Sequence, residues 1–154
     1  MAFKSFPHRW VMPAVVAGFC AVSLFAAGQG SPFAQSLVTR THASHPEVSE
    51  LGIAARTAHG CINIASTDRS DVGEKCEQED MTPMRTGRAV VGKEGSAIDI
   101  SLPLHDASGH LVGSAGIEIK PKPGESRAAV VAKAKTIAHE MEKQIPSKAR
   151  LLGQ

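Results

Sequence analysis

The chain has 154 residues, which is enough for one domain and a short additional segment. Its 17 Lys and Arg residues nearly balance its 15 Asp and Glu residues, so the chain lacks the excess of basic residues that is needed to neutralise phosphates. We therefore expect no nucleic acid partner. Hydrophobic residues make up 42% of the chain, but only 4% of residues are aromatic and none is Tyr, so its core must consist of aliphatic side chains.

The N-terminal segment has the pattern of a secretory signal peptide. Lys4 and Arg9 precede the apolar run Trp10–Ala27, and small residues then provide a cleavage site. We predict a signal peptide over residues 1–28, with cleavage after Ala34 as one alternative and an uncleaved membrane anchor as another. Its removal leaves 15 basic and 15 acidic residues in a periplasmic or secreted protein.

Two of the three cysteines, Cys61 and Cys76, follow the signal peptide. Exported proteins fold in oxidising compartments, where cysteine pairs form disulfides. We therefore predict a disulfide between Cys61 and Cys76, which would stabilise a small domain by about 3 kcal/mol on the chain-entropy estimate. The alternative is two free thiols, because sequence spacing alone does not establish disulfide geometry.

The first predicted elements are helical. Residues Ser36–Ser44 have apolar positions for two turns of helix, and Pro46 interrupts the pattern. A second helix is predicted over Pro46–Ala55, because Pro is favoured at the first helical position and acidic residues favour a helix N-terminus. The short run Cys61–Thr67 alternates in the manner of a strand, and we interpret it as the first strand of the sheet.

A polar, acidic stretch over Asp68–Asp80 has the composition of a solvated surface loop, and it lacks the spacing of a calcium-binding loop. We expect Asp80 to cap a short helix over Met81–Arg85, which Gly87 ends. A short strand over Arg88–Gly92 follows, and a turn then leads into the next strand.

The clearest pattern is a predicted hairpin of two strands, Ala97–His105 and His110–Lys120. Apolar and polar residues alternate regularly in the first strand, which buries one face. Between the strands, Asp106 and Gly109 occupy the first and last positions of a turn, as a type I turn prefers.

An amphipathic helix is predicted from Glu125 to Gln144. Its apolar residues recur every three or four positions and form a stripe that must be covered by the domain or by a partner. Pro146 ends the pattern, and we expect Ser147–Gln154 to form a frayed basic tail. The stripe consists of Val130, Ala134, Ile137, Ala138, Met141 and Ile145.

The chain resembles Cache domains, which are extracytoplasmic PAS-like sensor modules. The segments that carry the resemblance are the hairpin, the stretches Ile64–Lys75 and Thr86–Val91, and Asp80. The resemblance implies an α+β fold, with a PAS/Cache-like antiparallel sheet, an N-terminal helix, a short helix over the pocket and a C-terminal amphipathic helix. It places a single ligand-binding domain over residues 36–152. It also implies a role in signal transduction, in which a small molecule binds between the sheet and the loops over its other face.

The sequence departs from this family in two ways. Amino-acid-recognising members carry a Tyr/Trp/Arg/Asp signature, whereas this chain has no Tyr and its one Trp lies in the signal peptide. No membrane span and signalling domain follow Gln154, so we expect the domain to act alone, as a homodimer or through a partner protein.

On such a fold, polar side chains of the strands and arginines of the short helix would line the pocket. We predict a small organic anion as the ligand, because guanidinium groups bind carboxylates in a bidentate manner. The alternative is a solvated sheet face with no ligand, in a structural or partner-docking domain. The candidate ligand-binding residues are Asn63, Arg85, Arg88, Ser101, His105 and Ser114.

We predict from the sequence that the protein is not an enzyme and that it has no cofactor and no metal site. His42 and His45 are spaced to share a helix face, but a metal would need further ligands. Ser101, His105 and Asp106 resemble triad residues in type only, since neighbouring positions on a strand point to opposite faces. Motifs for a nucleophile elbow, a phosphate loop or a zinc protease are absent from the sequence.

Overall fold

The structure is a computed structural model that describes residues 30–154. The predicted signal peptide over residues 1–28 lies outside the described residues. In chain order the elements are α1 (Pro32–Ser44), β1 (Val48–Thr57), β2 (Gly60–Ser66), α2 (Gln78–Thr86), β3 (Val90–Val91), β4 (Ile98–His105), β5 (Leu111–Ile119), α3 (Arg127–Glu142) and α4 (Lys148–Leu151).

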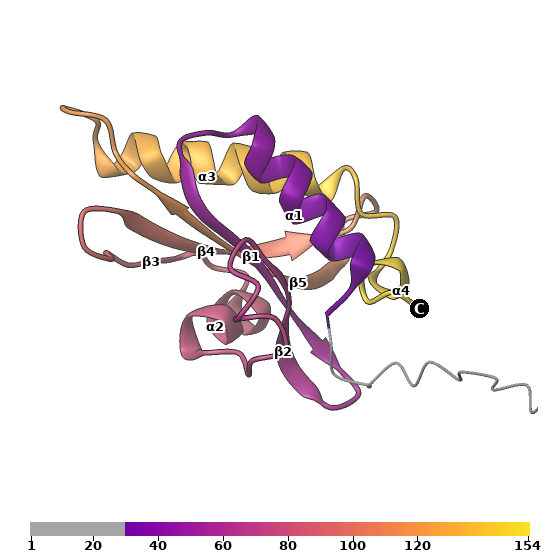
Figure 1. Cartoon of the computed structure of the whole chain (residues 1–154). Helices are drawn as coiled ribbons and strands as arrows, with labels where there is room; N and C mark the ends of the chain where they lie inside the picture. Colours follow the sequence, from indigo (N-terminus) through magenta and orange to yellow (C-terminus); the bar gives the residue numbers. More distant parts are fainter. Residues whose placement is uncertain (1–29) are drawn as a thin grey trace, which may run out of the picture.

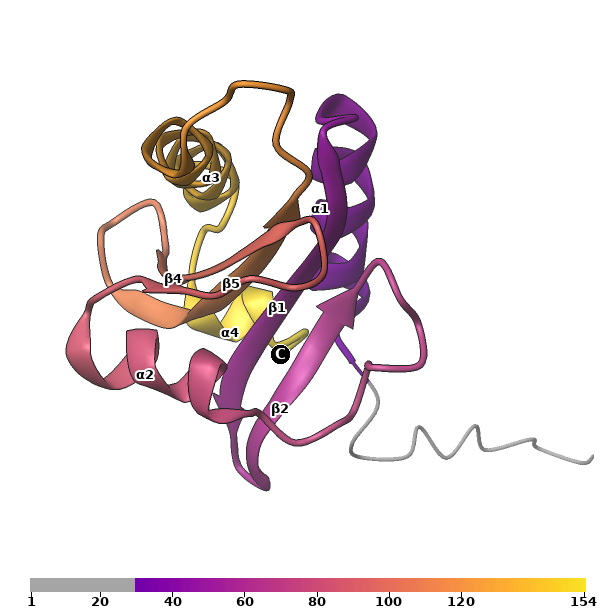
Figure 2. The ribbon, with the colours of Figure 1, turned by 90° about the vertical axis from the view of Figure 1, so that its left-hand side faces the viewer.

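The five strands form one antiparallel sheet in the order β2-β1-β5-β4-β3. Helices α1 and α3 cover one face of the sheet, and α2 lies on the other face (Figures 1 and 2). This arrangement confirms the predicted α+β fold with an antiparallel sheet and helices. It also leaves the face that carries α2 only partly covered, and that face holds the candidate site.

The predicted hairpin forms as β4 and β5. Ile100 pairs with Ile117, and the alternation places one set of side chains in the core and the other on the α2 side. At the turn, Asp106 Oδ1 accepts hydrogen bonds from the backbone N–H groups of Ser108 and His110, at 2.9 and 3.0 Å. Gly109 has a φ of 84°, a left-handed conformation that glycine adopts without strain.

The predicted helix over Pro46–Ala55 is wrong, because this segment lies in β1. Leu51, Ile53 and Ala55 are fully buried on the core face, and Glu50 and Gly52 face the α2 side. This is the period of a strand, and a helix over the same residues would have spread its apolar positions around its axis. The strand predicted over Cys61–Thr67 is therefore the second strand, β2, and not the first.

Helix α1 begins at Pro32, four residues before the predicted start at Ser36. Ser31 is its N-cap, because its hydroxyl accepts a hydrogen bond from the N–H of Ala34 at 3.2 Å. The backbone N–H of Ser31 also donates to the carbonyl oxygen of Ile64 in β2, at 2.8 Å. Residues 30 and 31 are therefore anchored to the sheet.

Helix α3 forms where the sequence predicts it, and its apolar stripe packs on the sheet. The tail after Pro146 is not frayed, because α4 follows and the side chain of Leu151 is fully buried. The larger side chains of the shared core are Leu37, Val38, Leu51, Ile53, Ile100, Leu102, Leu104, Ile117, Ile119, Ile137, Met141, Ile145 and Leu151.

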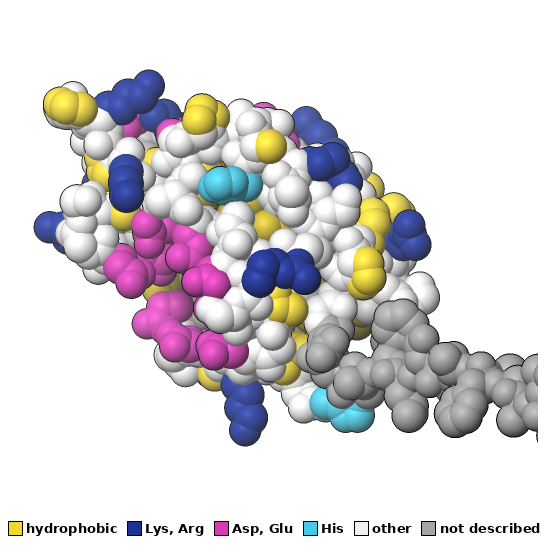
Figure 3. Space-filling model, in the orientation of Figure 1, with side chains coloured by type: hydrophobic (Ala, Val, Ile, Leu, Met, Phe, Trp, Pro, Cys, Tyr) yellow, Lys and Arg dark blue, Asp and Glu magenta, His cyan; other side chains and the backbone are white. Residues whose placement is uncertain are grey.

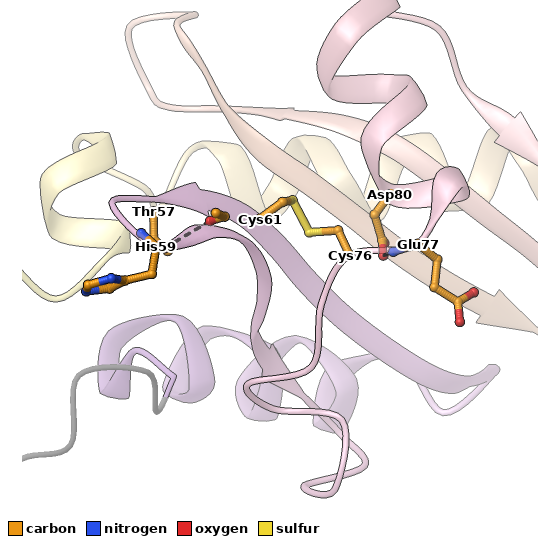
Figure 4. Close-up of a disulfide and its surroundings, with 7 residues drawn as sticks. Thr57, His59, Cys61, Cys76, Glu77 and Asp80 are labelled. Carbon is orange, nitrogen blue, oxygen red and sulfur yellow. Dashed lines mark hydrogen bonds between the residues drawn. A yellow bond between two sulfur atoms is a disulfide. The ribbon is translucent and has the colours of Figure 1, made fainter.

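The predicted disulfide is present. Cys61 in β2 is bonded to Cys76, and their Cα atoms are 5.3 Å apart (Figure 4). Cys76 immediately precedes Glu77, the N-cap of α2. Segment 73–76 runs antiparallel beside β2. The backbone N–H of Asn63 donates to the backbone carbonyl of Glu74, and the backbone N–H of Cys76 donates to the backbone carbonyl of Cys61. The disulfide therefore fixes the chain that enters α2 to the edge of the sheet.

Helix α2 is longer than predicted and begins at Gln78. Asp80 is not its N-cap. It lies three residues after the N-cap Glu77 and accepts a hydrogen bond from the backbone N–H of Glu77 at 3.0 Å. Gly87 ends the helix with a φ of 68°, as predicted, and the strand expected over Arg88–Gly92 is reduced to the two residues of β3.

Candidate functional site

A pocket of about 670 Å³ lies between α2 and the sheet, within the size range of small-molecule sites. Strands β1, β2, β4 and β5 contribute to it, together with the segment that leads into α2 and the turn between β3 and β4. Its lining residues are Glu50, Gly52, Asn63, Ser66, Asp71, Glu74, Lys75, Glu77, Glu79, Asp80, Gly92, Lys93, Glu94, Gly95, Asp99, Ser101, Gly116 and Glu118.

The floor of the pocket is a row of small residues across the sheet. Ser101 of β4 pairs with Gly116 of β5, Gly116 pairs with Gly52 of β1, and Gly52 pairs with Ser66 of β2. A Cβ atom added to Gly116 would meet no atom within 4 Å, apart from those of its chain neighbours. The two glycines therefore leave an open space above bare backbone in the middle of the sheet.

A row of three carboxylates runs beside this floor. Asp99 of β4 pairs with Glu118 of β5, and Glu118 pairs with Glu50 of β1. Directly opposed like charges on neighbouring strands destabilise a sheet, so this arrangement has an energetic cost in the unliganded domain.

The walls of the pocket add further acidic groups. Glu77, Glu79 and Asp80 belong to the start of α2, Glu74 precedes them, and Glu94 lies in the turn between β3 and β4. Figure 3 shows acidic side chains gathered into one patch on the face of the molecule that includes this region. With Asp71, the pocket has nine carboxylates.

Burial and mutual repulsion perturb several of these groups. Burial, with repulsion from Glu94 and Glu118, raises the pKa of Asp99 above its ordinary value of 3.8. The pKa of Glu50 is raised in the same way, by burial first and then by Asp71 and Glu118. The ionised forms of these carboxyl groups are thus disfavoured in the folded domain.

The pocket holds too little positive charge to balance its carboxylates. Lys75 and Lys93 are its basic residues, so its formal charge is −7 when all groups are ionised. Within residues 30–154, none of the nine carboxylates forms an ion pair with a basic side chain. The site presents unneutralised negative charge, which opposes the organic anion that the sequence predicts.

Ser101 provides a polar group at the floor. The residue is only 3% exposed, and its hydroxyl makes no hydrogen bond with any side chain or backbone group of the described residues. The one buried side-chain polar atom without a partner among the described residues is Ser114 Oγ, so the Ser101 oxygen opens onto the pocket, where a ligand can form a hydrogen bond with it.

The six predicted ligand-binding residues do not form one site. Asn63 and Ser101 line the acidic pocket. Arg88 and His105 instead line a shallower depression of about 540 Å³ at the edge of β4, where the ring Nδ1 of His105 lies 2.7 Å from the carboxylate of Glu142. Arg85 is exposed on α2.

Ser114 faces the α2 side of the sheet, where it pairs with Ala54 and Pro103. It is fully buried, its hydroxyl has no hydrogen-bond partner, and it does not line the acidic pocket.

The acidic lining is not predicted from the sequence, in which Asp68–Asp80 is interpreted as a solvated loop. That stretch does contribute Asp71, Glu74, Glu77, Glu79 and Asp80 to the pocket, so its charge was the available signal. The other four carboxylates come from β1, β4, β5 and the β3–β4 turn, and only the fold brings them to the same place.

The structure bears on the other chemistries considered above. In residues 30–154, no group of three or more His, Cys, Asp or Glu side chains is arranged to hold a metal ion. His105 contacts Glu142, whereas Asp106 contacts His110, so these residues do not assemble a triad with Ser101. The helices of the described part of the chain are also too short or too polar to cross a bilayer.

Comparison with known proteins gives matches at the level of structure. Neither a protein-family model nor a curated protein matches the sequence. A GAF sensor protein from Burkholderia vietnamiensis aligns with a TM-score of 0.51 and 12% identity, over 76% of this chain and 76% of that chain. The domain therefore has a GAF/PAS-like fold, and this match says nothing of its ligand.

Two further structures align less well. A type II free methionine-R-sulfoxide reductase from Thermoplasma acidophilum has a TM-score of 0.45 and 14% identity, over 71% of this chain and 92% of that chain. The inducer-binding domain of the transcription factor PobR from Acinetobacter, in complex with 3-hydroxybenzoic acid, has a TM-score of 0.45 and 10% identity, over 73% of this chain and 97% of that chain. Neither alignment is close enough to support an argument about this protein.

Proposed function

We propose that this protein is an exported, non-enzymatic sensor domain of the Cache type that binds a small molecule in the pocket between α2 and the sheet. The observation that carries the proposal is the open space above Gly52 and Gly116, bounded by polar side chains from four strands, from the β3–β4 turn, and from α2 with the segment before it. A domain used only for structure or docking has no need of an unfilled pocket over the middle of its sheet. Convergent polar groups in such a cavity are typical of ligand sites.

The disulfide supports the proposed export, because such bonds persist in oxidising compartments. Helix α1 favours signal-peptide cleavage after Gly28 over cleavage after Ala34. Cleavage after Ala34 would remove the N-cap Ser31 and the first three residues of α1, including the buried side chain of Ala34. The exported domain that we propose therefore begins at Gln29.

A thermal-shift screen of the domain from Gln29 to Gln154 tests the proposed function. The library should contain organic anions, neutral sugars and organic amines. A ligand at 100 times its dissociation constant adds about 2.7 kcal/mol to stability, which corresponds to roughly 10 °C for a domain of this size.

A pocket-filling variant locates the binding site. Gly116→Leu places a side chain in the open space with no backbone clash, and should abolish the shift caused by any ligand of the pocket. Ala128→Leu adds the same side chain to an exposed position on α3, on the other face of the sheet, and should leave the shift unchanged. If no compound class stabilises the domain, or if Gly116→Leu leaves the shift intact, the proposed pocket is not a ligand site.

A further inference from the structure

We propose that the ligand of the pocket is a linear aliphatic polyamine, a molecule with several ammonium groups along a flexible hydrocarbon chain. This inference rests on the proposed function, because it names the class of molecule that the same pocket binds.

The arrangement of charge requires a cation. Asp99, Glu118 and Glu50 lie side by side on three neighbouring strands without a basic partner in residues 30–154, and the carboxylates of Glu79 and Asp80 from α2 line the same pocket. Ammonium groups would neutralise these charges and would donate charge-assisted hydrogen bonds to the carboxylate oxygens. Binding would thus remove the repulsion that the empty site maintains.

The hydroxyl of Ser101 is an independent indication of a ligand. Ser101 is only 3% exposed and lines the pocket, and its hydroxyl has no hydrogen-bond partner among the described residues, so its oxygen is open to a ligand in the pocket. A hydroxyl oxygen can accept a hydrogen bond from an ammonium group. Ser101 is two residues from Asp99 on β4 and points to the same face, so one ammonium group can contact both side chains.

Two other kinds of cation fit the site less well. A single divalent metal ion requires several carboxylates that converge on one point, and no such group occurs in the described part of the chain. Quaternary ammonium ligands are usually held by aromatic side chains. The one aromatic residue in residues 30–154 is Phe33 of α1, which packs against Arg150 and not against the pocket.

The spread of the carboxylates favours a chain with more than one amine. Asp99 and Glu50 are on β4 and β1, with β5 between them, and neighbouring strands are about 4.8 Å apart, so the two positions are separated by about 10 Å. A triamine in an extended conformation spans this distance. Its methylene groups would lie over Gly52 and Gly116, which have no side chains of their own to fill the pocket.

Calorimetric titration of the domain from Gln29 to Gln154 with spermidine tests this inference. Butylamine, magnesium chloride and succinate serve as a monoamine, a metal and an anion for comparison. We expect spermidine to bind more tightly than butylamine or magnesium. Asp99→Asn should weaken spermidine binding about tenfold, the size of one charge-assisted hydrogen bond, and Ser101→Ala should weaken it by a smaller factor.

Glu140→Gln is the matched control, because it removes one exposed carboxylate from α3, outside the pocket. Equal weakening by Glu140→Gln and Asp99→Asn would mean nonspecific attraction and would overturn the inference. Tighter binding of magnesium than of spermidine would also overturn it. If succinate or a neutral compound binds and Gly116→Leu abolishes that binding, the polyamine is wrong but the proposed function stands. If no compound binds, both are wrong.

Discussion

Replacement of Asp99 by Asn should make the unliganded domain more stable at neutral pH, although it should impair ligand binding. Asp99 is directly opposed to Glu118 across the β4–β5 pair and is partly buried. Removal of one like-charge cross-strand contact and of its desolvation cost is expected to raise the free energy of unfolding by about 1 kcal/mol. For a domain of this size, the melting temperature would rise by about 4 °C.

The pH dependence of this gain gives a second check. Because the pKa of Asp99 is raised in the folded state, the folded domain binds a proton there more readily than the unfolded chain does. The cost of ionised Asp99 is therefore fully present above the raised pKa, and it disappears as the pH falls toward the ordinary value of 3.8. The stability advantage of Asp99→Asn should be largest at neutral pH and should shrink under acidic conditions.

Urea unfolding of the wild type and Asp99→Asn, at neutral pH and at about pH 4, measures both effects. Glu140→Gln serves as the control and should give no gain, because Glu140 is exposed and pairs with His45. A variant that is less stable than the wild type at neutral pH, or a gain that is equal at both pH values, would refute the argument that the acidic row is electrostatically strained.

Three other predictions concern the scaffold. Ile137 is buried in the core, so Ile137→Asp should lower the free energy of unfolding in urea by several kcal/mol. Lys143→Asp, at an exposed position, should lower it by about 0.5 kcal/mol or less. Equal unfolding curves for the two variants would show that α3 is not part of the core. Thiol labelling of the unfolded, unreduced protein should find Cys61 and Cys76 unreactive, and reduction should lower stability by about 3 kcal/mol; two reactive thiols before reduction would contradict the disulfide. N-terminal sequencing of the exported protein should begin at Gln29, and recovery of the intact N-terminus from membranes would favour an anchor.

Much of the fold could be predicted from local patterns. The hairpin of β4 and β5 carries strict alternation and a well-formed turn, and α3 carries a continuous apolar stripe. In these segments the local propensity and the buried face agree. The disulfide followed from the predicted compartment and from the number of cysteines that remain after the signal peptide.

Two wrong predictions, the helix over Pro46–Ala55 and the frayed tail, came from signals that are ambiguous over short distances. Pro46 and the acidic residues after it favour a helix N-terminus, but the spacing of Leu51 and Ile53 fits a strand with one buried face. The tail after Pro146 is polar and basic, and its helix is held by the burial of Leu151 against the rest of the domain. In both segments tertiary packing overrode the local preference.

The site could be predicted only in part. Asn63 and Ser101, which the sequence places at polar strand positions, do line the pocket on the α2 side. Glu50 was assigned to a helix, so its position beside Glu118 was not foreseeable. The charge of the pocket depends on strand order and register, which place residues far apart in sequence in one row. The sequence also does not reveal that Arg85 and Arg88 lie outside this pocket.

An NMR titration of the isotopically labelled domain with spermidine locates the bound polyamine, because each backbone amide reports on its own surroundings. If the polyamine lies in the space above Gly52 and Gly116, we expect saturable shifts concentrated at Gly52, Ser101 and Gly116. Shifts centred on Arg88 and His105, or small unsaturable shifts spread over all acidic residues, would contradict it.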